Sequence, residues 1–214
     1  EQRKLLILKK ERLERIIDAL DGAEKGTITM SGFYTMNIAG LERHLPICPL
    51  NENIDIAGFI IFGDVELTEK CAEALYKKAP EHDVMITAES KGIPLIHAMC
   101  RRSGKNRYVL ARKSVKLYMK NVLECKTKSI TTGAEQVLYI DGDDAEYLKG
   151  KKVLIVDDVI STGGSLASLE NLVTQSGGII VGKMAILAEG DAIDRKDITY
   201  LAPLPLFDKE GKPI

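Results

Sequence analysis

The sequence contains no apolar run that approaches the roughly 20 residues needed to cross a bilayer as a helix. It also shows no recognisable secretory signal segment. Its four cysteines are widely separated and include no Cys-x-x-Cys pair, which argues against a structural zinc site and against a disulfide framework. We therefore expect reduced thiols, a cytoplasmic location and no membrane partner.

An excess of charge of one sign is also missing. The chain has 30 Lys and Arg residues against 31 Asp and Glu residues, which gives a formal net charge of −1. Without a basic field the protein is not drawn to nucleic acid, so nucleic acid is not an expected partner. Walker A and Gly-x-Gly-x-x-Gly phosphate motifs are absent as well. Any anionic ligand must therefore be held by other local groups.

Strand and helix signals alternate through the middle of the chain. A helix is expected between a cap at Thr68 and a stop at Pro80, and the other expected elements are strands at 84–88, 108–111, 137–140, 153–156 and 179–188 and helices at 94–102 and 165–176. Such alternation predicts an α/β fold with a parallel central sheet flanked by helices. Ligands of such sheets bind at the carboxyl ends of the strands.

The two ends of the chain differ from this core, which we place at 56–190. Residues 2–21 have apolar side chains at helical spacing, and the Gly- and Pro-containing segment after them predicts a small N-terminal hood or cap within 1–55. Residues 191–214 are expected to form a C-terminal extension that packs on the core or on the hood. The polar, basic stretch 113–129 is expected to be a loop.

The most informative segment is VLIVDDVISTGGS at 153–165. A buried strand runs into two carboxylates, and small residues then lead into an amphipathic helix, whose first turn offers free N–H groups to an anion. The segment therefore predicts a phosphate site. A plain strand and glycine-rich turn is the structural alternative, and a phosphate-receiver domain is a second one that fits poorly, because its acids come early in the chain. The site residues are Asp157, Asp158, Ser161, Thr162, Gly163, Gly164 and Ser165.

This segment closely resembles the 5-phosphoribosyl-1-pyrophosphate (PRPP) signature of the type I phosphoribosyltransferase family. The resemblance implies the type I phosphoribosyltransferase fold. It also implies that Asp157 and Asp158 bind the ribose hydroxyls and act in catalysis, and that residues 161–165 hold the 5-phosphate. Carboxylates are strong acceptors for hydroxyl groups, and their charge beside C1 would stabilise a developing oxocarbenium ion.

Two further segments match the family in order along the chain. Ser90, Lys91 and Gly92 follow an expected strand and resemble the pyrophosphate-binding loop, although a plain loop before a helix has the same appearance. Arg112 and Lys113 resemble the basic start of the flexible loop that covers the pyrophosphate. A solvated, charged surface is the alternative reading of this basic stretch.

The base pocket is less readable. Residues 56–64 resemble the hood segment of adenine enzymes, which would place Phe62 against the base, and a place in the core is the alternative for this ring. Thr131-Thr132-Gly133 and the strand expected after them are similar to the hypoxanthine/guanine and adenine branch of archaeal and related purine enzymes. Many adenine enzymes carry a Glu-Tyr-Gly triplet in the flexible loop, and this triplet is absent here. The general acid or base therefore has no assignment from the sequence.

Taken together, the resemblance implies transfer of the phosphoribosyl group from PRPP to a purine base in nucleotide salvage. Adenine is the first expectation, with hypoxanthine, guanine and xanthine next. Mg²⁺ is the implied cofactor, carried on PRPP and in contact with Asp157 and Asp158, and the implied assembly is a homodimer. The alternatives are a PRPP-sensing regulator without turnover and an enzyme with a pyrimidine acceptor.

Overall fold

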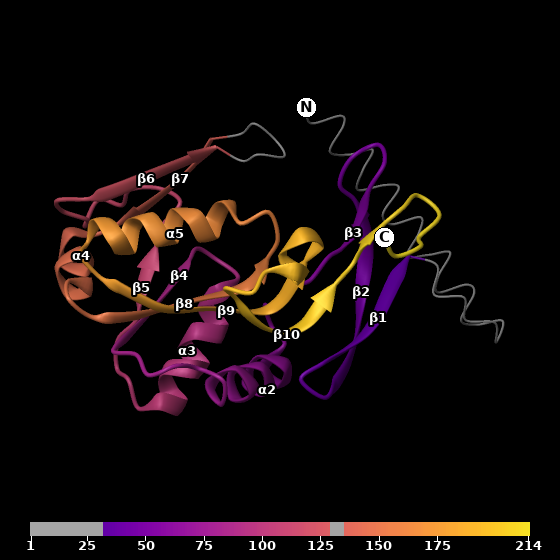
Figure 1. Cartoon of the computed structure of the whole chain (residues 1–214), viewed down its shortest axis with the longest axis horizontal. Helices are drawn as coiled ribbons and strands as arrows, with labels where there is room; N and C mark the ends of the chain where they lie inside the picture. The colour runs from indigo at the N-terminus through magenta and orange to yellow at the C-terminus, as the bar shows by residue number, and fades with distance from the viewer. Residues whose placement is uncertain (1–31, 129–134) are drawn as a thin grey trace.

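The computed structural model describes residues 32–128 and 135–214 (Figure 1). The helix expected at 2–21 and the triplet at 131–133 lie outside the described residues. No helix in these two stretches is both long enough and apolar enough to cross a membrane.

A parallel sheet forms the centre of the molecule and confirms the expected fold class. Within the described residues it has the strand order β10-β9-β8-β4-β5, and every neighbouring pair is parallel. Its strands are β4 (Val84–Ala88), β5 (Val109–Ala111), β8 (Lys152–Ile160), β9 (Ile179–Glu189) and β10 (Thr199–Leu204). The middle strands are apolar on both faces because both faces are covered.

Helices cover the two faces of the sheet (Figure 1). The α2 (Val65–Tyr76) and α3 (Gly92–Ser103) helices lie on one side. The other side carries α5 (Gly164–Gln175), α4 (Gly142–Leu148) and the antiparallel ribbon of β6 (Leu123–Lys128) and β7 (Glu135–Ile140). Alternate residues of β8 serve the two layers: Leu154 and Val156 pack with α2 and α3, whereas Val153 and Ile155 pack with α5.

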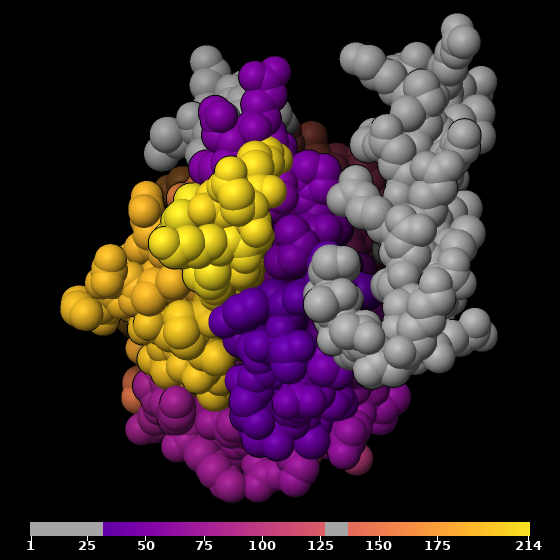
Figure 2. Space-filling model, turned by 90° about the vertical axis from the view of Figure 1, so that its right-hand side faces the viewer, coloured from indigo at the N-terminus to yellow at the C-terminus, as the bar shows by residue number. Residues whose placement is uncertain are grey.

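A smaller antiparallel sheet, the hood, stands beside the carboxyl-end edge of the main sheet. Its order is β1-β2-β3-β11, with β1 (Phe33–Ile38), β2 (Leu41–Pro49), β3 (Asp55–Ala57) and β11 (Leu206–Phe207). The chain reaches β11 directly from β10, after the short 3₁₀ helix η1 (Gly190–Asp194) has connected β9 to β10. Residues 191–214 therefore contribute a strand to each sheet. Figure 2 shows this C-terminal segment in yellow beside the indigo hood strands.

Three local expectations were wrong. The α2 helix begins at Val65 because Asp64 caps it by accepting from the Leu67 N–H at 3.0 Å, and Thr68 lies one turn further in. Residues 123–128 form a strand, because Leu123 and Cys125 alternate toward the layer beneath α5. The β8 strand continues past the two acids to Ile160, since its pairing with β9 extends that far.

Candidate active site

A cavity of about 320 Å³ lies where the carboxyl ends of the main strands meet the hood. The main sheet and its loops supply its polar groups, and the hood supplies an apolar wall. The lining residues are Ile56, Ala57, Gly58, Phe59, Ala88, Glu89, Ser90, Lys91, Lys113, Asp157, Asp158, Val159, Ser161, Ser165, Glu189 and Leu204. We call this the main cavity. Its position matches the ligand site expected for a parallel sheet.

The two acids of β8 lie on its floor and are nearly inaccessible, with exposed fractions of 9% for Asp157 and 5% for Asp158. Asp157 Oδ1 accepts a hydrogen bond from the Asp158 N–H at 2.9 Å. Burial, and then the negative charge of Asp158, raises the pKa of the Asp157 carboxyl well above its ordinary value, while Lys91 opposes this shift. Paired carboxylates so far from water are poised for hydroxyl or cation partners supplied by a ligand.

The signature turn forms a second, smaller cavity of about 90 Å³ next to the acids. All five residues expected at the phosphate site, 161–165, line it, and Ser161 and Ser165 also line the main cavity. Gly163 is the N-cap of α5 and adopts a φ of +81°, which L side chains rarely adopt. The first turn of α5, whose N–H groups have no carbonyl partner within the helix, thus borders a space suited to one phosphate group.

The loop after β4 lines the opposite wall. Ser90 and Lys91 border the main cavity, and Lys91 Nζ lies 2.6 Å from Asp158 Oδ2 and 3.4 Å from the Phe59 carbonyl oxygen. Gly92 does not line the cavity, but it allows close packing: a Cβ atom there would lie 2.1 Å from Thr87 Oγ1. The peptide bond between Glu89 and Ser90 is cis.

The basic residues expected at the flexible loop separate in the structure. Lys113 lines the main cavity, whereas Arg112 does not. Arg112 instead pairs with Glu89, Nε to Oε1 at 3.3 Å, and Glu89 also accepts from the Lys113 N–H at 2.9 Å. That backbone hydrogen bond is the main reason that the pKa of Glu89 is lowered. Glu89, which the sequence reasoning missed, therefore connects the loop after β4 to the loop after β5.

Phe62 is not brought to the main cavity. The segment between β3 and α2 alternates, so Phe59 and Ile61 are buried while Ile60 and Phe62 are about half exposed. Phe59 is the aromatic residue on the cavity wall. An alternating pattern of burial in this segment separates the ring of Phe59 from that of Phe62. Which of the two rings is buried depends on the position of the hood. Glu189 and Leu204 were missed as well.

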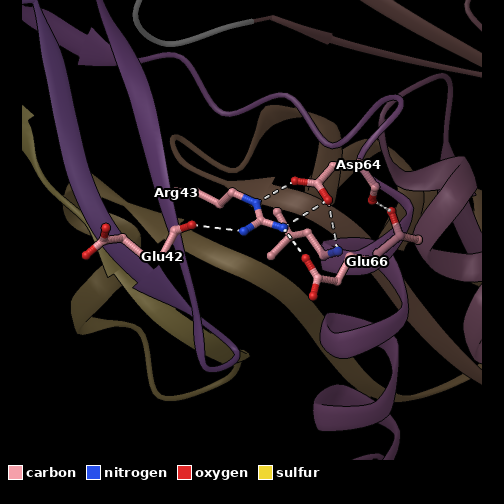
Figure 3. Close-up of polar contacts among 6 residues, drawn as sticks. Glu42, Arg43, Asp64 and Glu66 are labelled. Atoms are coloured by element: carbon pink, nitrogen blue, oxygen red, sulfur yellow. Dashed lines mark hydrogen bonds and ion pairs between the residues drawn. The ribbon is translucent and has the colours of Figure 1, made fainter. Parts of the chain in front are cut away.

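The hood is fastened to the main domain by Arg43 of β2 (Figure 3). Its guanidinium donates to both carboxylate oxygens of Asp64, at 2.6 and 3.2 Å, and to Glu66 at 3.1 Å. These hydrogen bonds raise the pKa of Arg43 and lower that of Asp64. Asp64 ends the segment between β3 and α2. At the start of this segment, the Gly58 N–H donates to the Pro46 carbonyl oxygen at 2.7 Å. β2 thus holds both ends of the segment that carries Phe59.

Comparison with known proteins agrees with this geometry. A phosphoribosyl transferase domain model matches residues 65–201. An adenine phosphoribosyltransferase of Thermotoga sp. (strain RQ2) is 38% identical over 138 residues, which cover 64% of this chain and 71% of that protein. A hypoxanthine/guanine phosphoribosyltransferase of Methanotorris igneus is 30% identical over 187 residues, covering 81% of this chain and 98% of that protein.

A solved structure supports the fold. The crystal structure of adenine phosphoribosyltransferase from Thermoanaerobacter pseudethanolicus superposes with a TM-score of 0.62 at 24% identity, and covers 74% of this chain and 95% of that one. The signature, the parallel sheet and these similarities lead to the same result: the chain belongs to the phosphoribosyltransferase family.

Proposed function

We propose that this protein transfers the 5-phosphoribosyl group of PRPP to a purine base in nucleotide salvage, with adenine as the first candidate, and releases pyrophosphate. The observation that carries the proposal is the main cavity itself. It combines an anion-binding turn, a buried acid pair, a basic loop and an apolar hood wall in one space of suitable size. Relatives named for adenine and for hypoxanthine/guanine transfer support the purine class.

Each part of the substrate has a matching part of the cavity. Residues 161–165 and the start of α5 bind the 5-phosphate, and Asp157 and Asp158 accept hydrogen bonds from the ribose hydroxyls. Ser90, Lys91 and Lys113 surround the pyrophosphate. The base then lies against Phe59 and the hood.

In the reaction a ring nitrogen of the base forms a bond to C1 of the ribose while the bond from C1 to the pyrophosphate oxygen breaks. That oxygen takes the bonding electron pair, and the ring N–H proton of the base passes to water or to the released pyrophosphate. Lys91 stabilises the charge gathering on the pyrophosphate, and the two carboxylates stabilise positive charge on the ribose. No covalent intermediate with the protein is needed.

Mg²⁺ fits this arrangement as a cation carried by the substrate. In the described parts of the chain, no group of three or more His, Cys, Asp or Glu residues is placed to hold a metal by itself. The acid pair beside Lys91 offers carboxylate oxygens to a cation whose other ligands are diphosphate oxygens and water, as Mg²⁺ prefers. When bound, the cation would neutralise diphosphate charge.

We also propose a homodimer in the cytoplasm. Leu117 and Tyr118, next to the basic loop, are exposed apolar side chains of the kind that a second subunit would cover. All four cysteines are free, in keeping with a reducing compartment. Sedimentation at several protein concentrations tests the dimer, and a monomer at every concentration would reject it.

The decisive experiment measures pyrophosphate release from PRPP and Mg²⁺ with adenine, guanine, hypoxanthine, xanthine, uracil and orotate in turn. We expect turnover with purines and the highest kcat/KM with adenine. Binding of PRPP without release of pyrophosphate from any base would instead support the PRPP-sensing alternative.

A further inference from the structure

Glu189 is the one carboxylate of the main cavity wall, among the described residues, that neither belongs to the acid pair nor braces a loop. It ends β9 and lies opposite Leu204, the last residue of β10. Two residues after Leu204 the chain enters the hood, where Leu206 pairs with Ile56. Glu189 therefore lies at the junction between the main sheet and the hood.

The cavity lining places the Glu189 side chain. It borders the main cavity, and so does Phe59. Leu187, two residues earlier on β9, packs in the same cluster as Phe59 and the hood residue Phe207. Glu189 thus shares the cavity with its apolar wall.

Within the described residues, no hydrogen bond or ion pair engages the Glu189 carboxylate. It is half-buried, and this burial raises its pKa, with Lys91 acting in the opposite direction. A desolvated carboxylate without a partner is costly, so the cavity is built to receive a hydrogen-bond donor at this point.

The chemistry of the two substrates identifies that donor. PRPP carries its phosphate anions at both ends, and a carboxylate would repel them. Its ribose hydroxyls already have the acid pair. The base is uncharged and offers N–H groups, and an adenine ring carries an exocyclic amino group with two donors.

Resting on the proposed function, we propose that Glu189 selects the base by accepting a hydrogen bond from the exocyclic amino group of adenine. A base with a carbonyl oxygen at that position would bring two acceptors together and be disfavoured. Glu189 would thus be a specificity-determining residue in the same cavity as Phe59.

The test compares wild-type protein with Glu189→Gln and Glu189→Ala, using adenine and unsubstituted purine, which lacks the amino group. Glu210→Gln is the matched control, because Glu210 is an exposed carboxylate in the same C-terminal region. For Glu189→Ala we expect kcat/KM with adenine to fall about 10- to 100-fold. With purine the loss should be under about 3-fold, with an unchanged KM for PRPP, since only adenine presents the donor.

Equal losses with adenine and purine, a change confined to PRPP, or no loss at all would overturn this assignment. Glu189→Gln keeps the size of the side chain and a neutral acceptor oxygen, so it covers the case in which the alanine variant does not fold. Its loss should again be larger with adenine than with purine, because an amide oxygen is a weaker acceptor than a carboxylate. If wild-type protein releases no pyrophosphate with any base, it is the proposed function that fails. Calorimetry of adenine binding then decides on Glu189: weaker binding by Glu189→Ala supports its role, and equal or absent binding rejects it.

Discussion

The ammonium group of Lys91 lies 2.6 Å from Oδ2 of Asp158. This contact joins the loop after β4 to the acid pair of β8, two segments that are 67 positions apart in the sequence. It places a cation between the expected ribose and pyrophosphate positions, where the bond to the leaving group breaks. The same ammonium reaches the Phe59 carbonyl oxygen, so Lys91 also connects the sheet to the hood.

Replacing Lys91 by Ala should therefore weaken PRPP use far more than base use. The variant loses a cation at the pyrophosphate position and leaves Asp158 buried without its partner. We expect the KM for PRPP to rise about tenfold or more, with a smaller change in the KM for the base. Lys77→Ala is the control, since Lys77 forms an exposed pair with Glu73 on α2. A selective effect on the base would contradict the assignment of this loop to pyrophosphate.

The acid pair should make the free protein less stable as the pH rises. Folding raises the pKa of the Asp157 carboxyl. Between about pH 4, where this carboxyl titrates in the unfolded chain, and its raised pKa in the folded protein, the folded state therefore binds more protons than the unfolded state. Over that window the free energy of unfolding decreases with pH. Asp157→Asn removes this contribution while its amide oxygen still accepts from the Asp158 N–H.

Thermal unfolding without ligands measures this effect. The Tm of Asp157→Asn minus the Tm of wild type should be larger at about pH 8 than at about pH 5. Each kcal/mol of difference in the free energy of unfolding corresponds to about 2–4 °C in Tm. The kcat/KM of Asp157→Asn should fall, because Asn presents an NH2 group in place of one of the carboxyl oxygens that accept from the ribose hydroxyls. A Tm difference that does not vary with pH would show that Asp157 titrates normally in the folded state.

Gly92 should tolerate no side chain while Thr87 is present. Alanine is ordinarily the better helix residue, yet its Cβ would lie 2.1 Å from Thr87 Oγ1 and 3.2 Å from Asp157 Oδ1. We expect Gly92→Ala to lower both Tm and kcat/KM. Adding Thr87→Ala should restore most of the Tm, because the Thr87 hydroxyl is buried and has no hydrogen-bond partner to lose. Wild-type behaviour of Gly92→Ala alone would disprove the clash.

The Arg43 contacts should matter for the base rather than for PRPP. Arg43→Ala releases Asp64 at the end of the segment that carries Phe59, so we expect the KM for the base to rise several-fold and the KM for PRPP to stay unchanged. Arg43→Lys should recover only part of the loss, because an ammonium cannot make the two-pronged contact. Arg107→Ala, which removes an ion pair with Asp144 far from the cavity, is the control. Equal changes in both KM values would indicate general loosening of the fold.

The sequence predicted those parts of the site that are contiguous in the chain. Residues 153–165 carry strand, acids and turn in one segment, so their geometry is local and the structure brings them together. The base wall is different, because the pairing of β9 with β10 brings Glu189 beside Leu204, and only the position of the hood adds Phe59. The resemblance of residues 56–64 to the hood segment pointed to Phe62, whereas the folded segment brings Phe59 to the cavity. The role of Glu89 was not visible in the sequence because its side-chain partners, Arg112 and Lys113, come from the loop after β5.

The course of the chain through the hood affects how the protein is made. Three hood strands, β1 to β3, leave the ribosome before any strand of the main sheet, whereas β11 follows the last of them. The edge of β3 that β11 covers therefore stays unpaired until residue 207 has been synthesised. Strand β10 of the main sheet ends at Leu204 and β11 begins at Leu206, so a nascent chain completes its parallel sheet and the wall of its base pocket almost together.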